Sequence, residues 1–258
     1  MSKTGIGVDI GGSGIKTAPV DLETGEFLDD RYRIPTPQPA TPRAVVKAVA
    51  TSLRQFDIKK NAPIGVTFPG VVQRGIVRTA ANMDDDWIDS DLVDAIEQAT
   101  GHHVAAMNDA DAAGYAEYKR GAARDFPGLV LLVTLGTGIG TALIADGRLV
   151  PNTELGHVII DGLDAEEYAA ESARERHGLD WDGWIPHLQR YFSEMERLLW
   201  PDLIVVGGGV SKSHHMFLPE LDLRAPIVPA ELRNGAGIAG AAALAAQAAK
   251  RDKKRKKR

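Results

Sequence analysis

The chain has 258 residues, of which 44% are hydrophobic and 25% are charged, and its formal net charge is −5. It contains no cysteine, which excludes disulfides and thiolate metal sites, and no apolar run reaches the roughly 18 residues that a transmembrane helix needs. The amino-terminal residues also lack the apolar core of a signal peptide. We therefore expect a cytoplasmic protein that does not enter a membrane and that forms one large domain or two small ones.

The first predicted element is a β-hairpin with a glycine-rich turn, in the stretch GIGVDIGGSGIKTAPVD from Gly5 to Asp21. The turn is not a P-loop, because Ile15 separates Gly14 from Lys16, and it is not a dinucleotide fingerprint, because a β-branched strand follows it. Glycines let a ligand approach the backbone amides, and phosphate is the usual ligand of such a turn. The sequence leaves open a phosphate-binding turn or a plain hairpin turn.

Helices and strands alternate after this hairpin, which indicates an α/β architecture. Asn108 and Asp109 fall where a strand leads straight into a helix, the position at which α/β folds bind ligands. Asp109 suits either a helix cap or a general base. The predicted elements are a helix over 41–57 capped by Thr41, a strand over 62–70, a helix over 89–101, a strand over 103–109 and the helix that follows it.

A second hairpin repeats the first one about half a chain later. Leu131–Asp146 aligns with Ile6–Asp21 at a constant offset of 125 residues, with apolar strands on both sides of a glycine-rich turn. Asp9 of the first hairpin is replaced by Thr134 in the second, so one half carries a carboxylate and the other a hydroxyl. The repeat predicts two similar domains whose glycine turns could hold one anionic ligand.

The remaining chain contains helices around 165–177 and 184–199, a strand over 203–209 and an alanine-rich helix over 236–249. Glu154 and His157, in ELGH, fit a ligand site, a surface salt bridge or a core histidine. The triple Gly207–Gly209 could form the floor of a nucleotide site or a tight turn. GAGIAG, over 235–240, matches Gly-x-Gly-x-x-Gly but follows no strand, so we expect close backbone packing at a helix start.

Charge is unevenly distributed along the chain. The last nine residues, KRDKKRKKR, carry eight basic residues and one acidic residue, a net charge of +7, so the rest of the chain stands at −12. A basic end on an acidic body suggests a polyanionic partner or a solvated, disordered tail. The tail is expected to be disordered.

Five motifs, in this order, resemble those of the ROK family (repressors, open reading frames and kinases) in the actin-like ATPase superfamily: DIGGSGIK, NDADAAGYAE, LGTGIGTAL, ELGH and VVGGGVS. The resemblance extends from Gly5 to about Ala249. It implies an α/β fold of two ribonuclease-H-like, actin-like ATPase lobes with a cleft between them. We expect a small lobe of residues 1–109 plus about 236–249, a large lobe of residues 110–235, and the tail of residues 250–258.

Within the family, the stretches RIPTPQPATP, TFPGVV and TAANMDDDWI are similar to those of members that phosphorylate glucose from inorganic polyphosphate, often also from ATP. Alternatives are an ATP-dependent hexokinase acting on glucose, mannose or an N-acetylhexosamine, and a sugar-responsive regulator. A regulator would need a helix-turn-helix domain before the first hairpin, where only four residues precede Gly5. The resemblance further implies a homodimer that binds no nucleic acid and no membrane.

The resemblance also implies roles for individual residues. Asp109 would take the proton of the glucose 6-hydroxyl, and Asp9 would hold Mg²⁺, through water. Glucose would be bound by Asn82, Asn108, Asp109, Glu154, His157 and Glu166. The donor phosphates would be bound by Gly11, Gly12, Ser13, Gly14, Lys16, Thr134, Gly136, Thr137, Gly138, Gly207, Gly208 and Gly209.

The chain departs from the wider family at one site. Many members build a zinc site from the histidine of Glu-x-Gly-His and three cysteines, and this chain has no cysteine, so no zinc is expected. What then orients His157 is left open. The link from His157 to Glu166 is short, so Glu167 or Glu171 could be the sugar ligand in place of Glu166.

Overall fold

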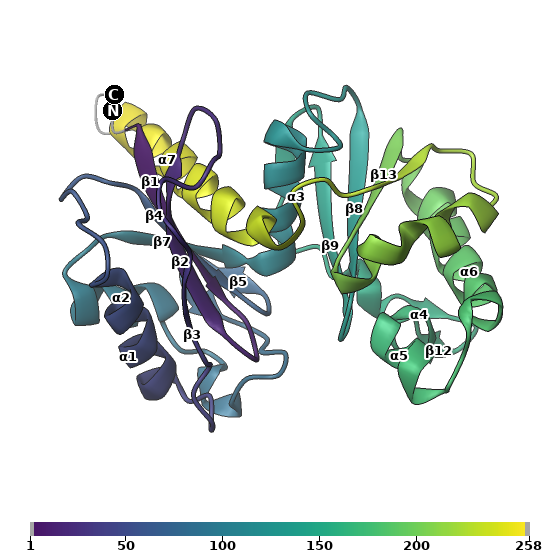
Figure 1. Ribbon diagram of the computed structural model, residues 1–258, viewed down its shortest axis with the longest axis horizontal. Coiled ribbons are helices and arrows are strands. Elements are labelled where there is room, and N and C mark those ends of the chain that lie inside the picture. The colour runs from purple at the N-terminus through teal and green to yellow at the C-terminus, as the bar shows by residue number, and fades with distance from the viewer. Residues whose placement is uncertain (1–2, 256–258) are drawn as a thin grey trace. The chain divides into compact units, whose positions relative to one another are not determined.

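The computed structural model describes residues 3–255, which form two compact units (Figure 1). The first unit consists of residues 1–116 and 235–258, and the second of residues 117–234. The boundary lies inside a helix, between Ala116 and Glu117, and not at Asp109 as we expected. The final helix belongs to the first unit and extends to Arg255, so residues 250–255 are helical, and residues 256–258 lie outside the described range.

The first unit is built on a five-stranded sheet with the order β3-β2-β1-β4-β7. β1, β2 and β3 are antiparallel, whereas β4 and β7 run parallel to β1. The predicted hairpin is confirmed as β1 and β2, with Asp9 opposite Lys16. The strands are β1 (Thr4–Ile10), β2 (Ile15–Asp21), β3 (Tyr32–Ile34), β4 (Ile64–Phe68) and β7 (Val104–Asn108), with a small separate hairpin of β5 (Val72–Gln73) and β6 (Ile76–Val77).

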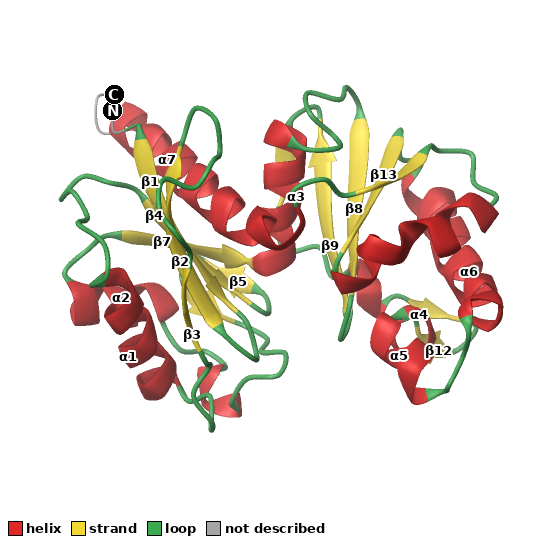
Figure 2. Cartoon of the chain, in the orientation of Figure 1, coloured by secondary structure: helices red, strands yellow, loops and turns green. Residues whose placement is uncertain are grey.

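Helices cover both faces of this sheet (Figures 1 and 2). Ile6, Val8 and Ile10 point to the face that packs on α1 and α2, because alternate strand residues face opposite sides. Gly5 and Gly7 lie on the other face, against α7. The helices are α1 (Pro42–Leu53), α2 (Leu92–Thr100), α3 (Asp109–Arg120) and α7 (Ala236–Arg255). The Thr41 hydroxyl caps α1, and Gly101, with a φ of 71°, ends α2, as predicted.

The second unit repeats the same topology, with the sheet order β10-β9-β8-β13-β14. β8, β9 and β10 are antiparallel, and β13 and β14 run parallel to β8, so the two glycine-turn hairpins hold equivalent positions. The similarity predicted from the repeat is confirmed. The strands are β8 (Leu129–Leu135), β9 (Ile139–Ala145), β10 (Arg148–Val150), β13 (Leu203–Gly207) and β14 (Ile227–Pro229), with a separate hairpin of β11 (Ile159–Ile160) and β12 (Leu163–Asp164).

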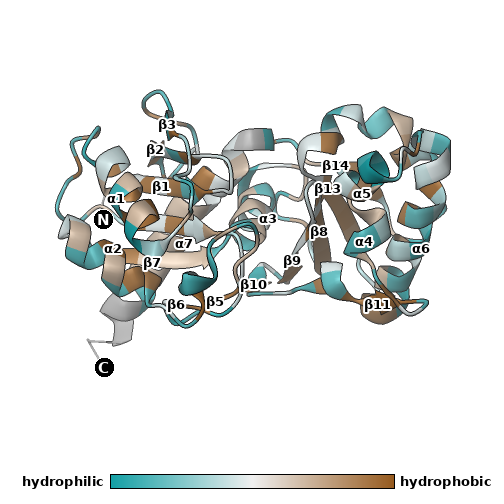
Figure 3. Cartoon of the chain, turned by 90° about the horizontal axis from the view of Figure 1, so that it is seen from below, coloured by the Kyte–Doolittle hydropathy of each residue, from teal (hydrophilic) through white to brown (hydrophobic). Residues whose placement is uncertain are grey.

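The sheet of the second unit is apolar on both faces (Figure 3). Leu131 and Val133 pack under α6, with Trp184 and Phe192 fully buried among them, whereas Val130 and Leu132 face the end of α3. The predicted helix over 165–177 is divided at Ala170, whose backbone is extended. The helices are α4 (Glu166–Ala169), α5 (Glu171–Arg176) and α6 (Trp181–Leu199), and the short 3₁₀ helices of the chain are η1 (Asp85–Trp87), η2 (Leu155–His157), η3 (Gly209–Met216), η4 (Leu218–Glu220) and η5 (Arg233–Gly235).

Candidate active site

The first glycine turn, Gly11–Gly14, is a closed loop braced from outside. The N–H groups of Gly11 and Gly14 each donate to the carbonyl of the other, at 3.1 and 3.4 Å. The turn itself therefore does not use the N–H groups of Gly12 and Ser13. Arg33 donates from its guanidinium to the Ser13 carbonyl at 3.1 Å, and the Thr36 hydroxyl donates to the Gly11 carbonyl at 2.5 Å. A turn fixed in this way keeps two amides available for an anion.

Asp9 lies at the carboxyl end of β1 among three neighbouring elements. Lys16, opposite on β2, donates to one carboxylate oxygen at 3.1 Å, and Thr67, opposite on β4, donates to the other at 3.0 Å. A Cβ at Gly237 would lie 3.2 Å from the carboxylate, so the first turn of α7 approaches Asp9 closely. A carboxylate near a helix N-terminus is stabilised by the helix dipole. This approach is the close packing expected of GAGIAG.

Asn108 and Asp109 occupy the junction of β7 and α3. Asn108, not Asp109, caps the helix: its side-chain oxygen accepts from the N–H of Asp111 at 3.0 Å, and its amide donates to the Gly70 carbonyl at 3.2 Å. Asp109 is the first residue of α3 and accepts from the N–H of Ala110 at 2.8 Å. The cap reading of Asp109 is therefore wrong, and its carboxylate is held by its own helix end. Asp111 is almost fully buried.

Asn82 belongs to the same region of the first unit. Its backbone is left-handed, with a φ of 56°, and a Cβ at Gly12 would come within 3.3 Å of the Asn82 Cβ. The structure thus brings this predicted sugar ligand against the first glycine turn. Both lie in the unit that carries Asp9 and Asp109.

The second glycine turn joins β8 and β9 in the second unit. Gly136 donates to the Gly138 carbonyl at 3.0 Å, and the Thr134 hydroxyl donates to the Gly140 carbonyl at 3.3 Å. Two residues from the α4–α5 segment brace the turn. Glu166 accepts from the Ile139 N–H at 2.7 Å, and Ser172 donates from its hydroxyl to the Thr137 carbonyl at 2.6 Å.

The Gly207–Gly209 triple lies beside this turn. Gly207 pairs with Thr134 across β13 and β8, and Gly208 has a φ of 87° at a place where a Cβ would collide with the Leu135 carbonyl. Ser211 donates from its N–H and its hydroxyl to the Gly208 carbonyl, at 3.3 and 2.8 Å. Thr134, the second turn and the glycine triple thus meet at the carboxyl ends of two parallel strands, the usual ligand edge of an α/β sheet.

Glu154 precedes η2, and His157 is the last residue of η2, also in the second unit. Partial desolvation raises the pKa of Glu154, although the nearby His157 opposes this shift. The hydrogen bond between His157 Nδ1 and Asp164, at 3.0 Å, raises the pKa of His157. Gly156 is required between them, because a Cβ there would collide with the Ile139 carbonyl. His157 is about half exposed, so it is not a core histidine, and the ion pair that it forms at the surface is with Asp164, not with Glu154.

The three candidate glutamates have different surroundings. Glu166 reaches back to the second turn, and a Cβ at Gly138 would collide with its carboxylate. Glu167 is exposed, and Glu171 lies near Gly209, where burial raises the pKa of the Glu171 carboxyl. Glu166 is therefore both a neighbour of the Glu154–His157 segment and a brace of the second glycine turn.

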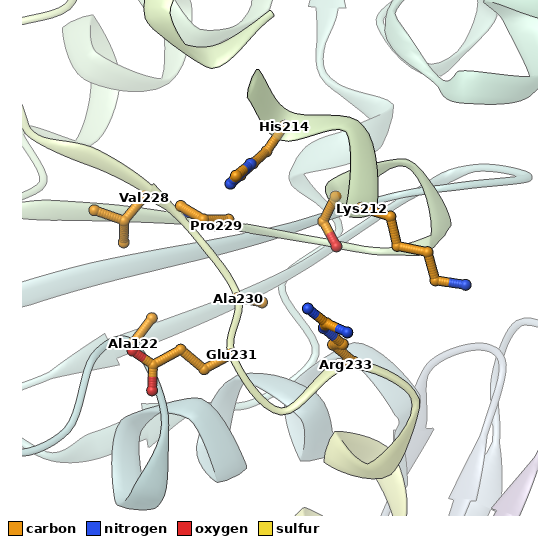
Figure 4. A pocket seen from close by; sticks show the side chains of 9 residues that line it. Ala122, Lys212, His214, Val228, Pro229, Ala230, Glu231 and Arg233 are labelled. Atoms are coloured by element: carbon orange, nitrogen blue, oxygen red, sulfur yellow. The ribbon is translucent and has the colours of Figure 1, made fainter. Parts of the chain in front are cut away.

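A pocket of about 450 Å³ opens next to the glycine triple (Figure 4). Lys212 and Arg233 lie on its rim, with Ser211, His214, Val228, Pro229, Ala230 and Glu231 among its walls. The carboxylate of Glu117, which is fully buried, accepts from the N–H groups of Ala122, Glu231 and Leu232 at 2.9, 3.2 and 2.7 Å. It therefore ties the end of α3 to the segment that follows β14, and so fixes two walls of the pocket.

The residues around Asp9 fit a hydrated Mg²⁺ and not an ion held mainly by protein ligands. Among residues 3–255 no group of three or more carboxylate or histidine side chains could hold a metal ion. Asp9 is a single carboxylate whose oxygens are also bound by Lys16 and Thr67. Such a donor set suits a hydrated Mg²⁺ that takes its remaining ligands from water and from substrate phosphates.

Three residues that sequence reasoning did not select belong to these sites. Arg33 and Thr36 brace the first turn, and Asp164 bonds His157. Arg33 and Thr36 lie in the stretch RIPTPQPATP, which carried part of the family resemblance but gave no sign of its contact. No local pattern could identify the contacts of Arg33 and Thr36, since each joins segments from different elements.

The repeated topology, with a glycine turn at the same place in each unit, is that of the actin-like ATPases, and the chain belongs to the ROK family, whose model matches residues 5–178. Polyphosphate glucokinase of Mycobacterium tuberculosis (strain ATCC 25618 / H37Rv) is 48% identical over 92% of this chain and 89% of that protein. Polyphosphate glucokinase of Mycobacterium leprae (strain TN) is 46% identical over 92% of this chain and 72% of that protein.

Two solved structures of sugar kinases also match nearly the whole chain. The inorganic polyphosphate/ATP-glucomannokinase of Arthrobacter sp. strain KM matches with a TM-score of 0.89 and 52% identity, over 95% of this chain and 99% of that chain. A ROK family glucokinase from Streptomyces griseus, solved with glucose and AMPPNP, matches with a TM-score of 0.79 and 26% identity, over 95% and 99% of the two chains. In the part of the chain that the structure describes, no helix has the length and apolar character needed to cross a membrane.

Proposed function

We propose that this protein transfers a phosphoryl group from inorganic polyphosphate to the 6-hydroxyl of glucose, with ATP as a second donor. The observation that carries the proposal is the 46–48% identity to polyphosphate glucokinases over 92% of the chain. The fold alone would not distinguish a kinase from a regulator, since a ROK family transcriptional regulator matches with a TM-score of 0.78 at 20% identity. The kinase assignment therefore depends on sequence identity and on the side chains.

Asp109 is the proposed general base. Its carboxylate takes the proton of the 6-hydroxyl while that oxygen forms a bond to the terminal phosphorus of the donor. The bridging P–O bond breaks at the same centre, and the shortened polyphosphate, or ADP, leaves with the bond electrons. Asn108 supports this role because it caps α3 and so fixes the backbone that carries Asp109.

Glucose recognition is assigned to a set of polar side chains. Asn82 and Asn108 of the first unit and Glu154, His157 and Glu166 of the second are polar groups able to bind sugar hydroxyls. A sugar whose hydroxyl is in the wrong position leaves one of these buried polar groups without a hydrogen-bond partner. The free-energy cost of that unpaired group is what rejects the wrong sugar.

The donor phosphates are assigned to the two glycine turns and to the cations beside them. The N–H groups of Gly12 and Ser13, with Lys16 and Arg33, suit a phosphate in the first unit. Thr134, Gly136–Gly138 and the glycine triple suit the donor in the second unit. The rim cations Lys212 and Arg233 would receive the rest of either donor. Mg²⁺ beside Asp9 would neutralise charge on the transferred phosphoryl group.

A second acceptor is favoured by one observation. The structure with 52% identity is that of a glucomannokinase, so mannose is a candidate acceptor alongside glucose.

We also propose a cytoplasmic homodimer, on the family resemblance alone.

A direct assay tests the proposal. The purified protein is given glucose, Mg²⁺ and either polyphosphate or ATP, and glucose 6-phosphate is measured, with mannose and N-acetylglucosamine as alternative acceptors. We expect glucose 6-phosphate from polyphosphate, and loss of activity with EDTA that excess Mg²⁺ restores. Activity with ATP but none with polyphosphate would overturn the donor assignment. Activity with neither donor would overturn the kinase assignment.

A further inference from the structure

A short hairpin separates His157 from Glu166. Its strands, β11 and β12, pair Ile159 with Asp164, and its turn is Asp161-Gly162, with φ angles of 55° and 83°. Asp-Gly with positive φ at both positions is the preferred sequence of a type I′ hairpin turn. The hairpin reverses the chain tightly, so that Asp164 returns beside His157.

Two contacts anchor the hairpin to the body of the second unit. Ile160 is buried in the main core cluster of that unit. Arg190 of α6 donates to both carboxylate oxygens of Asp161, at 2.8 and 3.0 Å. A bidentate pair of this kind fixes direction as well as distance, so β12 is held in place independently of any ligand.

Asp164 uses both of its oxygens inside the site. One accepts from His157 Nδ1 at 3.0 Å, and the other accepts from the N–H of Glu166 at 3.0 Å. Glu166 in turn accepts from Ile139 N–H on the second glycine turn. One carboxylate therefore connects the imidazole to the residue that braces the phosphate turn.

We propose that Asp164 is the positioning residue of the acceptor site, holding His157 in one orientation and one tautomer and tying it to Glu166. The proposal rests on the proposed function, in which His157 binds glucose. With the Nδ1 proton donated to Asp164, the neutral ring presents Nε2 as an acceptor for a sugar hydroxyl. In this cysteine-free chain, a carboxylate does the orienting that a metal ligand would otherwise provide.

The charges around the imidazole determine how the contact responds to pH. The carboxylates that act on His157 are those of Asp164, Glu166 and Glu154, and together with the Asp164 hydrogen bond they raise the pKa of His157, against desolvation. Asp164→Asn removes one charge, and its single oxygen cannot serve both the His157 and the Glu166 donors. The pKa of His157 should therefore fall toward its ordinary value in this variant.

Two variants and a matched control test the assignment. Asp164→Ala and Asp164→Asn are compared with Asp161→Asn, which removes a carboxylate from the same hairpin. In that control the amide oxygen can still accept from Arg190, Asn-Gly keeps the type I′ turn and Ile160 stays buried, so the His157 contact should remain. NMR titration of the His157 ring, assigned with His157→Asn, should show a pKa lower by roughly half a unit or more in Asp164→Asn and unchanged in Asp161→Asn. Glucose binding by calorimetry should weaken about tenfold in Asp164→Ala, with the KM for polyphosphate unchanged.

The outcomes distinguish a failure of the positioning role of Asp164 from a failure of the proposed function. An unchanged His157 pKa in Asp164→Asn, or equal weakening of glucose binding by Asp161→Asn and Asp164→Ala, would overturn the positioning role. A wild-type protein that neither binds glucose nor phosphorylates it would overturn the proposed function, whereas the NMR titration would still decide whether Asp164 fixes the imidazole.

Discussion

At the scale of single residues, Asp109 has the most specific role in the proposed mechanism. Asp109→Asn keeps the size of the side chain and the acceptor used by Ala110, but it cannot take a proton. We expect kcat to fall about 10²–10⁴-fold, with glucose binding and unfolding largely unchanged. Turnover rates and glucose calorimetry on the purified variant measure this.

The choice of control for this variant follows from burial. Asp111 is 1% exposed, so changing it would disturb the packing of α3 and it cannot serve as a neutral comparison. Asp30 is exposed in a loop of the same unit, and Asp30→Asn should leave kcat unchanged. Retention of more than a tenth of wild-type kcat in Asp109→Asn would remove Asp109 from the role of base.

Arg33 gives a second prediction at this scale. Its guanidinium bonds the Ser13 carbonyl and lies beside Lys16 on the neighbouring strand. Arg33→Ala removes both a charge and a brace of the first turn, so the KM for polyphosphate and for ATP should each rise about tenfold, while the KM for glucose stays constant. The control is Arg43→Ala, an exposed arginine on α1. If both variants behave alike, Arg33 has no special role in donor binding.

At the scale of elements, glycines on two strands allow α7 to lie directly on the sheet. A Cβ at Gly65 would collide with the Ala241 carbonyl, and one at Gly7 with the Ile238 carbonyl. Gly65→Ala should therefore lower the free energy of unfolding by about 2–3 kcal/mol or more, because neither backbone can give way without moving the helix. Urea denaturation measures this.

Gly101→Ala is the control for that variant. Gly101 has a positive φ but no neighbouring atom within 4 Å of an added Cβ, so only backbone strain of about 1 kcal/mol is expected. Equal losses in the two variants would mean that close packing of α7 contributes nothing beyond ordinary glycine effects.

The elements that could be predicted from the sequence are those with a long local pattern. We could predict both hairpins, α1 and α6 because their strand alternation or helical period extends over many residues. In α1 the Thr41 cap also marks where the helix begins. Strands of two or three residues, such as β11 and β14, have too few residues for a period, and tertiary pairing alone defines them. The Asp161-Gly162 turn, by contrast, is a local hairpin signal that the sequence itself carries.

The candidate site was predictable to the same degree. Its glycine turns are local motifs, but the contacts of Arg33 with Ser13 and of Glu166 with Ile139 join segments 20 and 27 residues apart. The replacement of Asp9 by Thr134 was visible in the repeat. That Lys16 and Thr67 flank Asp9 required the strand order of the folded sheet.

At the scale of the whole molecule, the same topology is used twice with different end groups. Each unit places a glycine turn between its first two strands, but the equivalent position near the end of the first strand is Asp9 in the first unit and Thr134 in the second. In the proposed function, a common scaffold with divergent side chains lets one unit provide the base and the metal carboxylate while the other provides threonine and a glycine triple. The division of roles in the proposed function therefore follows the asymmetry of the repeat.

The distribution of charge gives the last prediction. Long polyphosphate is a dense anion, and apart from the last nine residues this chain stands at −12, so the donor must meet local cations. If the +7 segment of residues 250–258 helps capture long chains, removing it should raise the KM for long polyphosphate about two- to threefold at low salt, with kcat and the KM for ATP and glucose unchanged. The difference should vanish at 1 M salt, where the Debye length falls from about 10 to about 3 Å.

Replacing Lys59 and Lys60 with alanine, a basic pair far along the sequence from the proposed donor residues, is the control for loss of charge alone. Equal KM values for the truncated and intact proteins at low salt would show that the tail takes no part in donor capture, leaving that role to Lys16, Arg33 and the cations on the pocket rim.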